Sequence, residues 1–149
     1  MTAAATDRRD RLLLAGRLLG VVLTALMGWI HLRLWLDGYR EVPVIGTLFV
    51  INAVGAGLLV AALLTVPARL RTATTAITAL FTAGTAAGLI LSLTVGLFGV
   101  HESLKTPLVP TTLTVESAGV VVLGLTSILG LTSQRRPLAS DTDAVQTTR

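Results

Sequence analysis

The stretch Met27–Phe49, MGWIHLRLWLDGYREVPVIGTLF, gathers polar and aromatic side chains between two long apolar runs. This pattern indicates the end of one membrane helix, a short loop and the start of the next helix. Of the 149 residues, 52% are hydrophobic and only 13% are charged, with a mean hydropathy of +0.78. Soluble domains carry about 25% charged residues, so the composition predicts that lipid surrounds most of the chain.

The charged residues fall in five places along the chain, and four long apolar intervals separate them. Each interval holds roughly 20 residues, which as a helix spans the roughly 30 Å of a bilayer's hydrocarbon core. The sequence therefore predicts an all-α bundle of four transmembrane helices, at about 12–36, 44–66, 73–100 and 111–131. We expect residues 1–11 to form an N-terminal cytoplasmic segment and residues 137–149, rich in Ser, Thr, Asp and Gln, to be disordered.

Arginine placement predicts the orientation, because positive residues in short loops stay on the cytoplasmic side. One side of the predicted bundle is strongly basic and the other is close to neutral, which places both termini in the cytoplasm. All basic residues but one are arginine, a composition typical of proteins from high-G+C genomes. It favours a multi-pass protein of a bacterial plasma membrane. The net charge of +4 follows from this topology and predicts no nucleic-acid partner. The absence of cysteine excludes thiol chemistry and disulfides.

Small residues on the predicted helices indicate packing surfaces, because membrane helices associate where their backbones approach closely. We expect these contacts mainly within one bundle, with a homodimer or another membrane protein as the alternative partner. The predicted packing residues are Gly16, Gly20, Ala53, Gly57, Ala61, Gly84 and Gly88.

Several side chains that lipid should exclude fall at one depth if the helices alternate in direction. Ionisable groups within a membrane usually point inward and pair with one another. The sequence therefore predicts that Glu116 pairs with Arg33 or His31 in an outer-leaflet polar pocket. Alternatively, these groups reach the interface or bridge helices without binding anything. The candidate pocket residues are His31, Arg33, Trp35, Asp37, Asn52 and Glu116.

Three cofactors are compatible with these residues. His31, His101, Glu102 and Glu116 supply donors for a borderline divalent metal ion. The two histidines could also ligate one haem iron axially, and a quinone headgroup could take hydrogen bonds from His31 and Glu116. No phosphate loop, nucleophile elbow or metalloprotease motif is present, so the sequence predicts no catalytic residue.

Residues 31–64, HLRLWLDGYREVPVIGTLFVINAVGAGLLVAALL, resemble the first-loop region of small uncharacterised four-helix membrane proteins of actinobacteria. The bundle size is similar to that of the DoxX-like family, some of whose members are associated with respiratory or sulfur redox enzymes. These resemblances imply a membrane bundle and carry over no site residue. The short loops, the missing catalytic motifs and the small-residue stripes that could accept further helices favour a non-catalytic accessory or stabilising component of a larger envelope or respiratory assembly. The alternative is an outer-leaflet protein that binds a small molecule, quinone or metal and has a redox role.

Overall fold

The computed structural model describes residues 3–134, and that part of the chain is helical without a β-strand. Its long helices are α1 (Ala3–Leu36), α2 (Ile45–Thr65), α3 (Arg71–Thr94) and α4 (Val109–Gln134). Two single 3-10 turns, η1 (Tyr39–Glu41) and η2 (Ala68–Leu70), precede α2 and α3. Each of the four long helices is long and apolar enough to cross a membrane. For the described residues, the prediction of an all-α chain with four such helices is therefore confirmed.

Helix α1 begins earlier than predicted, because nothing in the first residues interrupts it. The expected N-terminal segment 1–11 is helical from Ala3 onward, and Asp7 and Arg11 form an ion pair of 2.8 Å one turn apart. Its 34 residues make a helix of roughly 50 Å, longer than a hydrocarbon core of about 30 Å. The expected disordered tail, 137–149, lies outside the described residues.

Helix α3 ends at Thr94, before the predicted end at residue 100, because glycines turn the chain. The N–H groups of Val95 and Gly96 both bond to the Leu91 carbonyl, at 3.0 and 2.9 Å. Gly96 has a φ of 84°, the left-handed conformation that commonly ends helices and that glycine adopts without strain. Residues 95–108 therefore form a loop over the end of the bundle instead of extending the helix.

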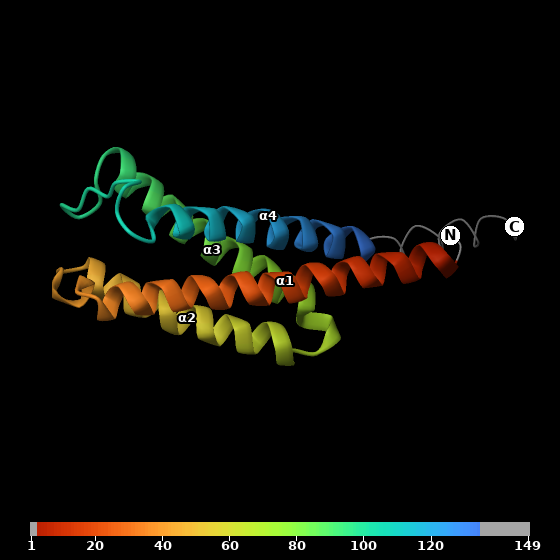
Figure 1. The fold of residues 1–149 in the computed structure, drawn as a ribbon. Helices are drawn as coiled ribbons and strands as arrows, with labels where there is room; N and C mark the ends of the chain where they lie inside the picture. Colours follow the sequence, from red (N-terminus) through yellow and green to blue (C-terminus); the bar gives the residue numbers. More distant parts are fainter. Residues whose placement is uncertain (1–2, 135–149) are drawn as a thin grey trace, which may run out of the picture.

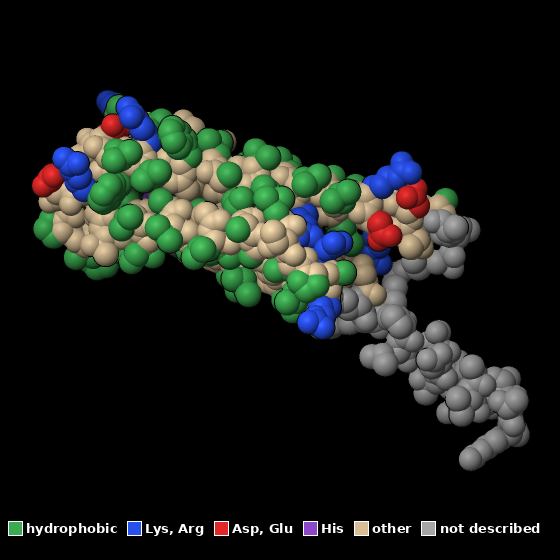
Figure 2. All heavy atoms as spheres, turned by 90° about the horizontal axis from the view of Figure 1, so that it is seen from below, with side chains coloured by type: hydrophobic (Ala, Val, Ile, Leu, Met, Phe, Trp, Pro, Cys, Tyr) green, Lys and Arg blue, Asp and Glu red, His purple; other side chains and the backbone are tan. Residues whose placement is uncertain are grey.

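The four helices do not pack equally on one another (Figure 1). Helix α1 lies against α2 and α4, and α3 lies against α4, whereas α2 and α3 contact each other little. The segments 37–44 and 95–108 lie together at one end, which we call the loop end. On the face shown in Figure 2, charged side chains gather toward the two ends and the middle is largely uncharged. This distribution is the one expected of a bundle that crosses a membrane.

Two glycines of α1 allow it to approach α4 closely, as their predicted packing role requires. A Cβ at Gly16 would collide with the Thr126 hydroxyl, and a Cβ at Gly20 would collide with the Leu123 side chain. Arg9 also reaches α4, donating hydrogen bonds to the Leu129 carbonyl at 2.8 Å and to a threonine hydroxyl nearby. Close backbone approach, supplemented by a polar contact, joins these two helices.

Four of the other predicted packing residues have open surroundings in the described part of the chain. A Cβ at Gly57 or at Gly84 would meet nothing within 4 Å, and Ala61 is exposed. Gly88 has an open environment too, with the Leu97 side chain 3.8 Å from its Cβ position. The predicted small-residue stripe of α3 therefore borders open space instead of a neighbouring helix, because α2 and α3 splay apart.

We expect Gly28→Ala to lower the free energy of unfolding by about 1 kcal/mol. The new methyl group would lie 2.7 Å from the Cβ of Ala56, which is fixed to the backbone of α2, and near the Ala53 carbonyl. The helices must therefore separate slightly in a buried region. Denaturant unfolding in detergent measures the loss, with Gly57→Ala as the matched control in open space. Equal stability of the two variants would contradict close packing at Gly28.

A candidate ligand pocket at the loop end

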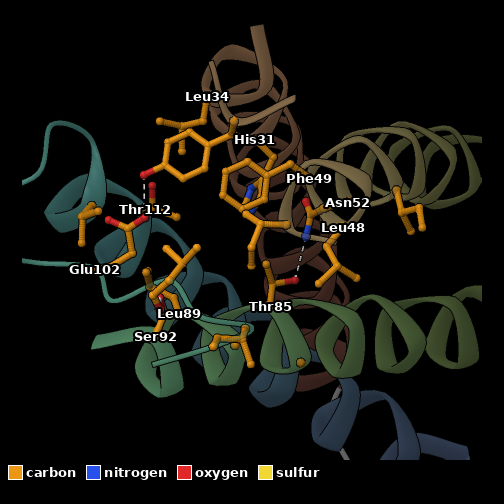
Figure 3. A pocket seen from close by; sticks show the side chains of 18 of the residues that line it. His31, Leu34, Leu48, Phe49, Asn52, Thr85, Leu89, Ser92, Glu102 and Thr112 are labelled. Atoms are coloured by element: carbon orange, nitrogen blue, oxygen red, sulfur yellow. Dashed lines mark hydrogen bonds between the residues drawn. The ribbon is translucent and has the colours of Figure 1, made fainter. Parts of the chain in front are cut away.

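A pocket of about 400 Å³ lies at the loop end, among all four helices, η1 and the 95–108 loop. This volume falls within the range of small-molecule sites in proteins. Figure 3 shows its lining side chains converging from separate helices. Most of the lining is aliphatic or aromatic, and the polar members are His31, Tyr39, Asn52, Thr85, Ser92, Glu102 and Thr112.

The pocket opens sideways between α2 and α3. Ile51 of α2 and Leu80 of α3 both line it, yet they are 56% and 74% exposed. Gly84 and Gly88 lie along the same edge and contribute no side chain to close it. If the four helices cross a membrane, this opening faces lipid, so an apolar molecule can enter without passing through water.

A tyrosine and a glutamate fasten the loop end over the pocket. The Tyr39 hydroxyl donates a hydrogen bond of 2.5 Å to Glu102, and the Tyr39 ring stacks on Phe49 with centroids 4.9 Å apart. The Glu102 N–H in turn bonds to the Ser92 carbonyl at 3.1 Å, which fixes the loop to α3. Burial, followed by the hydrogen bond and charge of Glu102, raises the pKa of Tyr39 to about 12.

An amide on α2 has a fixed orientation beside the pocket. The Thr85 hydroxyl donates to the Phe81 carbonyl at 2.9 Å, so its oxygen is left to accept. It accepts from Nδ2 of Asn52 at 2.9 Å, which fixes how the amide is turned. Oδ1 of Asn52 has no hydrogen-bond partner in the described part of the chain, although the residue is only 7% exposed.

A histidine and a glutamate meet between α1 and α4, beside the pocket. Nδ1 of His31 lies 3.0 Å from the Met27 carbonyl, and since a carbonyl only accepts, Nδ1 carries the proton. Nε2 lies 3.8 Å from Oε1 of Glu116. Glu116 is fully buried, and neither of its carboxyl oxygens has a hydrogen-bond partner within residues 3–134. The His31 ring also packs edge-on against Phe49 at 5.1 Å, which holds it at the pocket wall.

The structure assembles only part of the predicted polar pocket. Arg33 pairs with Asp37 on the outside of α1, at 3.1 Å, and both side chains are exposed. Of the two predicted partners, His31 and not Arg33 is the one near Glu116, because Asp37, just past the end of α1, is nearer to the arginine. Trp35 is partly buried but does not line the pocket. Of the six predicted residues, His31 and Asn52 line the cavity. Glu116 does not line it and lies behind His31.

The four predicted metal donors do not form one site. Within residues 3–134, no group of three or more histidine and carboxylate side chains is placed to hold a metal ion. His101 is exposed, with its ring against Gly96, and does not line the pocket that His31 lines. Glu102 is instead the partner of Tyr39. The early turn after α3 separates these donors.

Sequence reasoning missed three features of the pocket. The hydroxyl of Thr85 resembles those of the other threonines on α3, which bond their own helix, so nothing singled it out. Phe49 was not assigned to the site, and the link between Tyr39 and Glu102 was not foreseen. The glycines at 96 and 99 were the available signal, since they indicate a turn that brings the loop back over the bundle.

Over residues 3–134, the fold and the pocket together define an all-helical chain with four helices able to cross a membrane and a ligand-sized cavity at one end. Comparisons with protein-family models, curated proteins and solved structures found no match to this chain. The resemblance to actinobacterial and DoxX-like proteins therefore stays a prediction from the sequence.

Proposed function

We propose that this protein binds a small lipophilic molecule in its loop-end pocket. The observation that supports this function is a cavity of about 400 Å³ with apolar walls and several polar side chains that converge on it. Such sites typically combine a hydrophobic lining with a few polar groups that orient the ligand. Binding of such a molecule does not require a metal ion.

The positions of the buried polar side chains favour ligand binding over a role limited to bridging the helices. Asn52, His31 and Glu116 are buried in apolar helices, where polar groups without partners are costly. Helix bridging alone would use their hydrogen-bonding atoms on one another. Instead, Oδ1 of Asn52 and both oxygens of Glu116 have no hydrogen-bond partner in the described chain. The polar atoms around the pocket are therefore not fully used in holding the helices together.

The proposal includes a location in a bacterial plasma membrane, with both termini inside and the loop end outside. Its support is the arginine content of the end opposite the loop end, where Arg9 and Arg17 of α1 and Arg69 and Arg71 near η2 gather. The alternative role, an accessory component of a larger assembly, stays a prediction that mild purification with partner identification would test.

Filling the pocket edge should displace the ligand. We expect Gly84→Leu to lower the amount of copurifying lipophilic molecule about tenfold, because a leucine there occupies space along the opening. The protein would be purified in nanodiscs of defined lipid, extracted with organic solvent and compared by mass spectrometry with empty nanodiscs.

The matched control is Gly57→Leu, which adds the same side chain at a helical glycine with equally open space away from this pocket. It should retain the wild-type amount of ligand. No enriched molecule in the wild-type extract, or equal retention by both variants, would contradict binding in this pocket.

A further inference from the structure

Two arginines lie near each other at the end of the bundle opposite the loop end. Arg17 belongs to α1 and Arg71 begins α3, and their positive charges are close enough to repel each other. Within residues 3–134, neither forms an ion pair with a carboxylate. The segment 42–101, which includes α2 and α3, contains no Asp or Glu at all. The fold therefore brings two cations together and supplies no counter-charge from these helices.

The end of α2 fixes the position of the Arg17 guanidinium. In a continuing helix the Leu63 carbonyl would accept from the N–H four residues later, but that residue is Pro67, which has no N–H. Nη2 of Arg17 donates to this carbonyl instead. A positive charge there is also favoured by the dipole at the C-terminal end of α2.

Most of the Arg17 guanidinium stays available to a ligand. Nε and Nη1 make no hydrogen bond in the described chain and are not among its buried unpartnered atoms, so both reach the surface. The Arg71 side chain is exposed and makes no hydrogen bond within residues 3–134. Figure 2 shows basic side chains on the surface at this end of the bundle. Two guanidinium groups from different helices are thus accessible to one anion.

Apolar side chains beside these arginines are exposed too. Leu14 lies one turn from Arg17 on the same face of α1, and Leu70 precedes Arg71. A ligand that covers both kinds of surface has an anionic head and an apolar chain. A phospholipid combines the two, whereas a free phosphate ion would cover only the arginines.

We propose that Arg17 and Arg71 bind the phosphate of an anionic phospholipid where α1 meets the end of α2 and the start of α3. Guanidinium groups match phosphate oxygens through paired N–H···O bonds, and a shared anion replaces the repulsion between the arginines with attraction. A zwitterionic head would add another positive charge, so a head with net negative charge is favoured. This binding depends on the membrane location that we propose and not on a ligand in the loop-end pocket.

Dioleoylphosphatidylglycerol and dioleoylphosphatidylcholine are matched probes, because they share their acyl chains and differ in the charge of the head. Binding of each to the full-length protein in a non-ionic detergent would be measured by native mass spectrometry. We expect the wild type to bind the anionic lipid about tenfold more tightly. In Arg71→Gln this preference should largely disappear.

The control variant is Arg8→Gln, which removes the same charge from an exposed arginine without a hydrogen bond or ion pair in the described chain. Arg8 lies on α1 about 13 Å from Arg17 along the helix axis, so this variant should keep the full preference. Equal losses in the two variants would show that only the net charge of this end attracts the lipid. That result, or equal wild-type affinities for the two lipids, would overturn the inference.

Thermal unfolding separates lipid binding from a structural role of Arg71. Without lipid, Arg71→Gln should unfold at or above the wild-type temperature, because the repulsion from Arg17 is removed. The anionic lipid should raise the unfolding temperature of the wild type and of Arg8→Gln, but not that of Arg71→Gln. An equal rise with sodium phosphate at the same concentration would assign the arginines to a free anion and overturn the lipid site. Each of these outcomes leaves the loop-end pocket to its own test.

Discussion

The His31→Leu variant is expected to lose about 2 kcal/mol of unfolding free energy. Nε2 of His31 lies 3.8 Å from Oε1 of Glu116, whose side chain is fully buried without a hydrogen-bond partner in the described chain. Leucine removes that polar neighbour and leaves the carboxyl group between α1 and α4 among apolar atoms. Unfolding of the purified protein in mixed micelles, followed by far-ultraviolet circular dichroism, measures the loss.

The double variant His31→Leu/Glu116→Leu should recover most of this loss. When both polar partners become apolar, no desolvated polar group remains. The loss of unfolding free energy in the double variant should therefore be smaller than the sum of the losses in the two single variants. Glu116→Gln keeps the volume and hydrogen-bonding capacity and should be milder than Glu116→Ala. None of these changes should affect the Arg33–Asp37 pair, which lies outside. Additive losses in the double-variant cycle would show that His31 and Glu116 do not interact.

The Tyr39→Phe variant is expected to lose about 1.5 kcal/mol near neutral pH, after allowance for solvent screening at a partly exposed site. It removes the hydrogen bond to Glu102 that fastens η1 to the loop after α3. It should also remove an alkaline dependence of stability. The pKa of Tyr39 is raised to about 12 from an ordinary value of 10.0, so folding favours the protonated phenol. That contribution is complete below about pH 10 and is lost as the pH rises from 10 toward 12.

This titration can be observed directly, because Tyr39 is the chain's only tyrosine. The ultraviolet absorbance of phenolate should therefore rise with a midpoint near pH 12 in the folded protein. In Glu102→Gln the midpoint should fall but stay above the ordinary value, since burial, the largest single cause of the raised pKa, remains. A wild-type midpoint at the ordinary value would show that Tyr39 is exposed and unpaired in the membrane-embedded protein.

The helices were predictable from the sequence because lipid leaves little choice of structure for long apolar segments. Their ends were less predictable. Charged residues early in α1 look like a segment outside the helix, although Asp7 and Arg11 fit well on its surface. The end of α3 depends on Gly96, whose left-handed conformation is a local property that hydropathy does not report. A hydropathy average therefore locates the long apolar helices but not the turn at Gly96 that ends α3.

The candidate site was partly predictable for a related reason. A histidine, an amide or a carboxylate within an apolar run is visible in the sequence, so His31, Asn52 and Glu116 were found. Their partners were harder to identify, because Arg33 forms its ion pair with Asp37, four residues along the chain and just past the end of α1. Thr85 belongs to the site only because Asn52, on another helix, donates a hydrogen bond to its hydroxyl. Such pairs depend on how α2 and α3 are rotated, which one sequence does not specify.

If the protein binds a lipophilic ligand within a membrane, as we propose, the sideways opening between α2 and α3 changes what affinity means. A ligand that arrives through it is already dissolved in hydrocarbon, and lipid tails are as apolar as the leucines of the pocket wall. Transfer from bilayer to pocket therefore gains little from hydrophobic burial, and the few polar atoms at the inner wall determine selection. The relevant concentration is the ligand's mole fraction in the membrane, so occupancy should follow the lipid composition and be nearly independent of the volume of surrounding water.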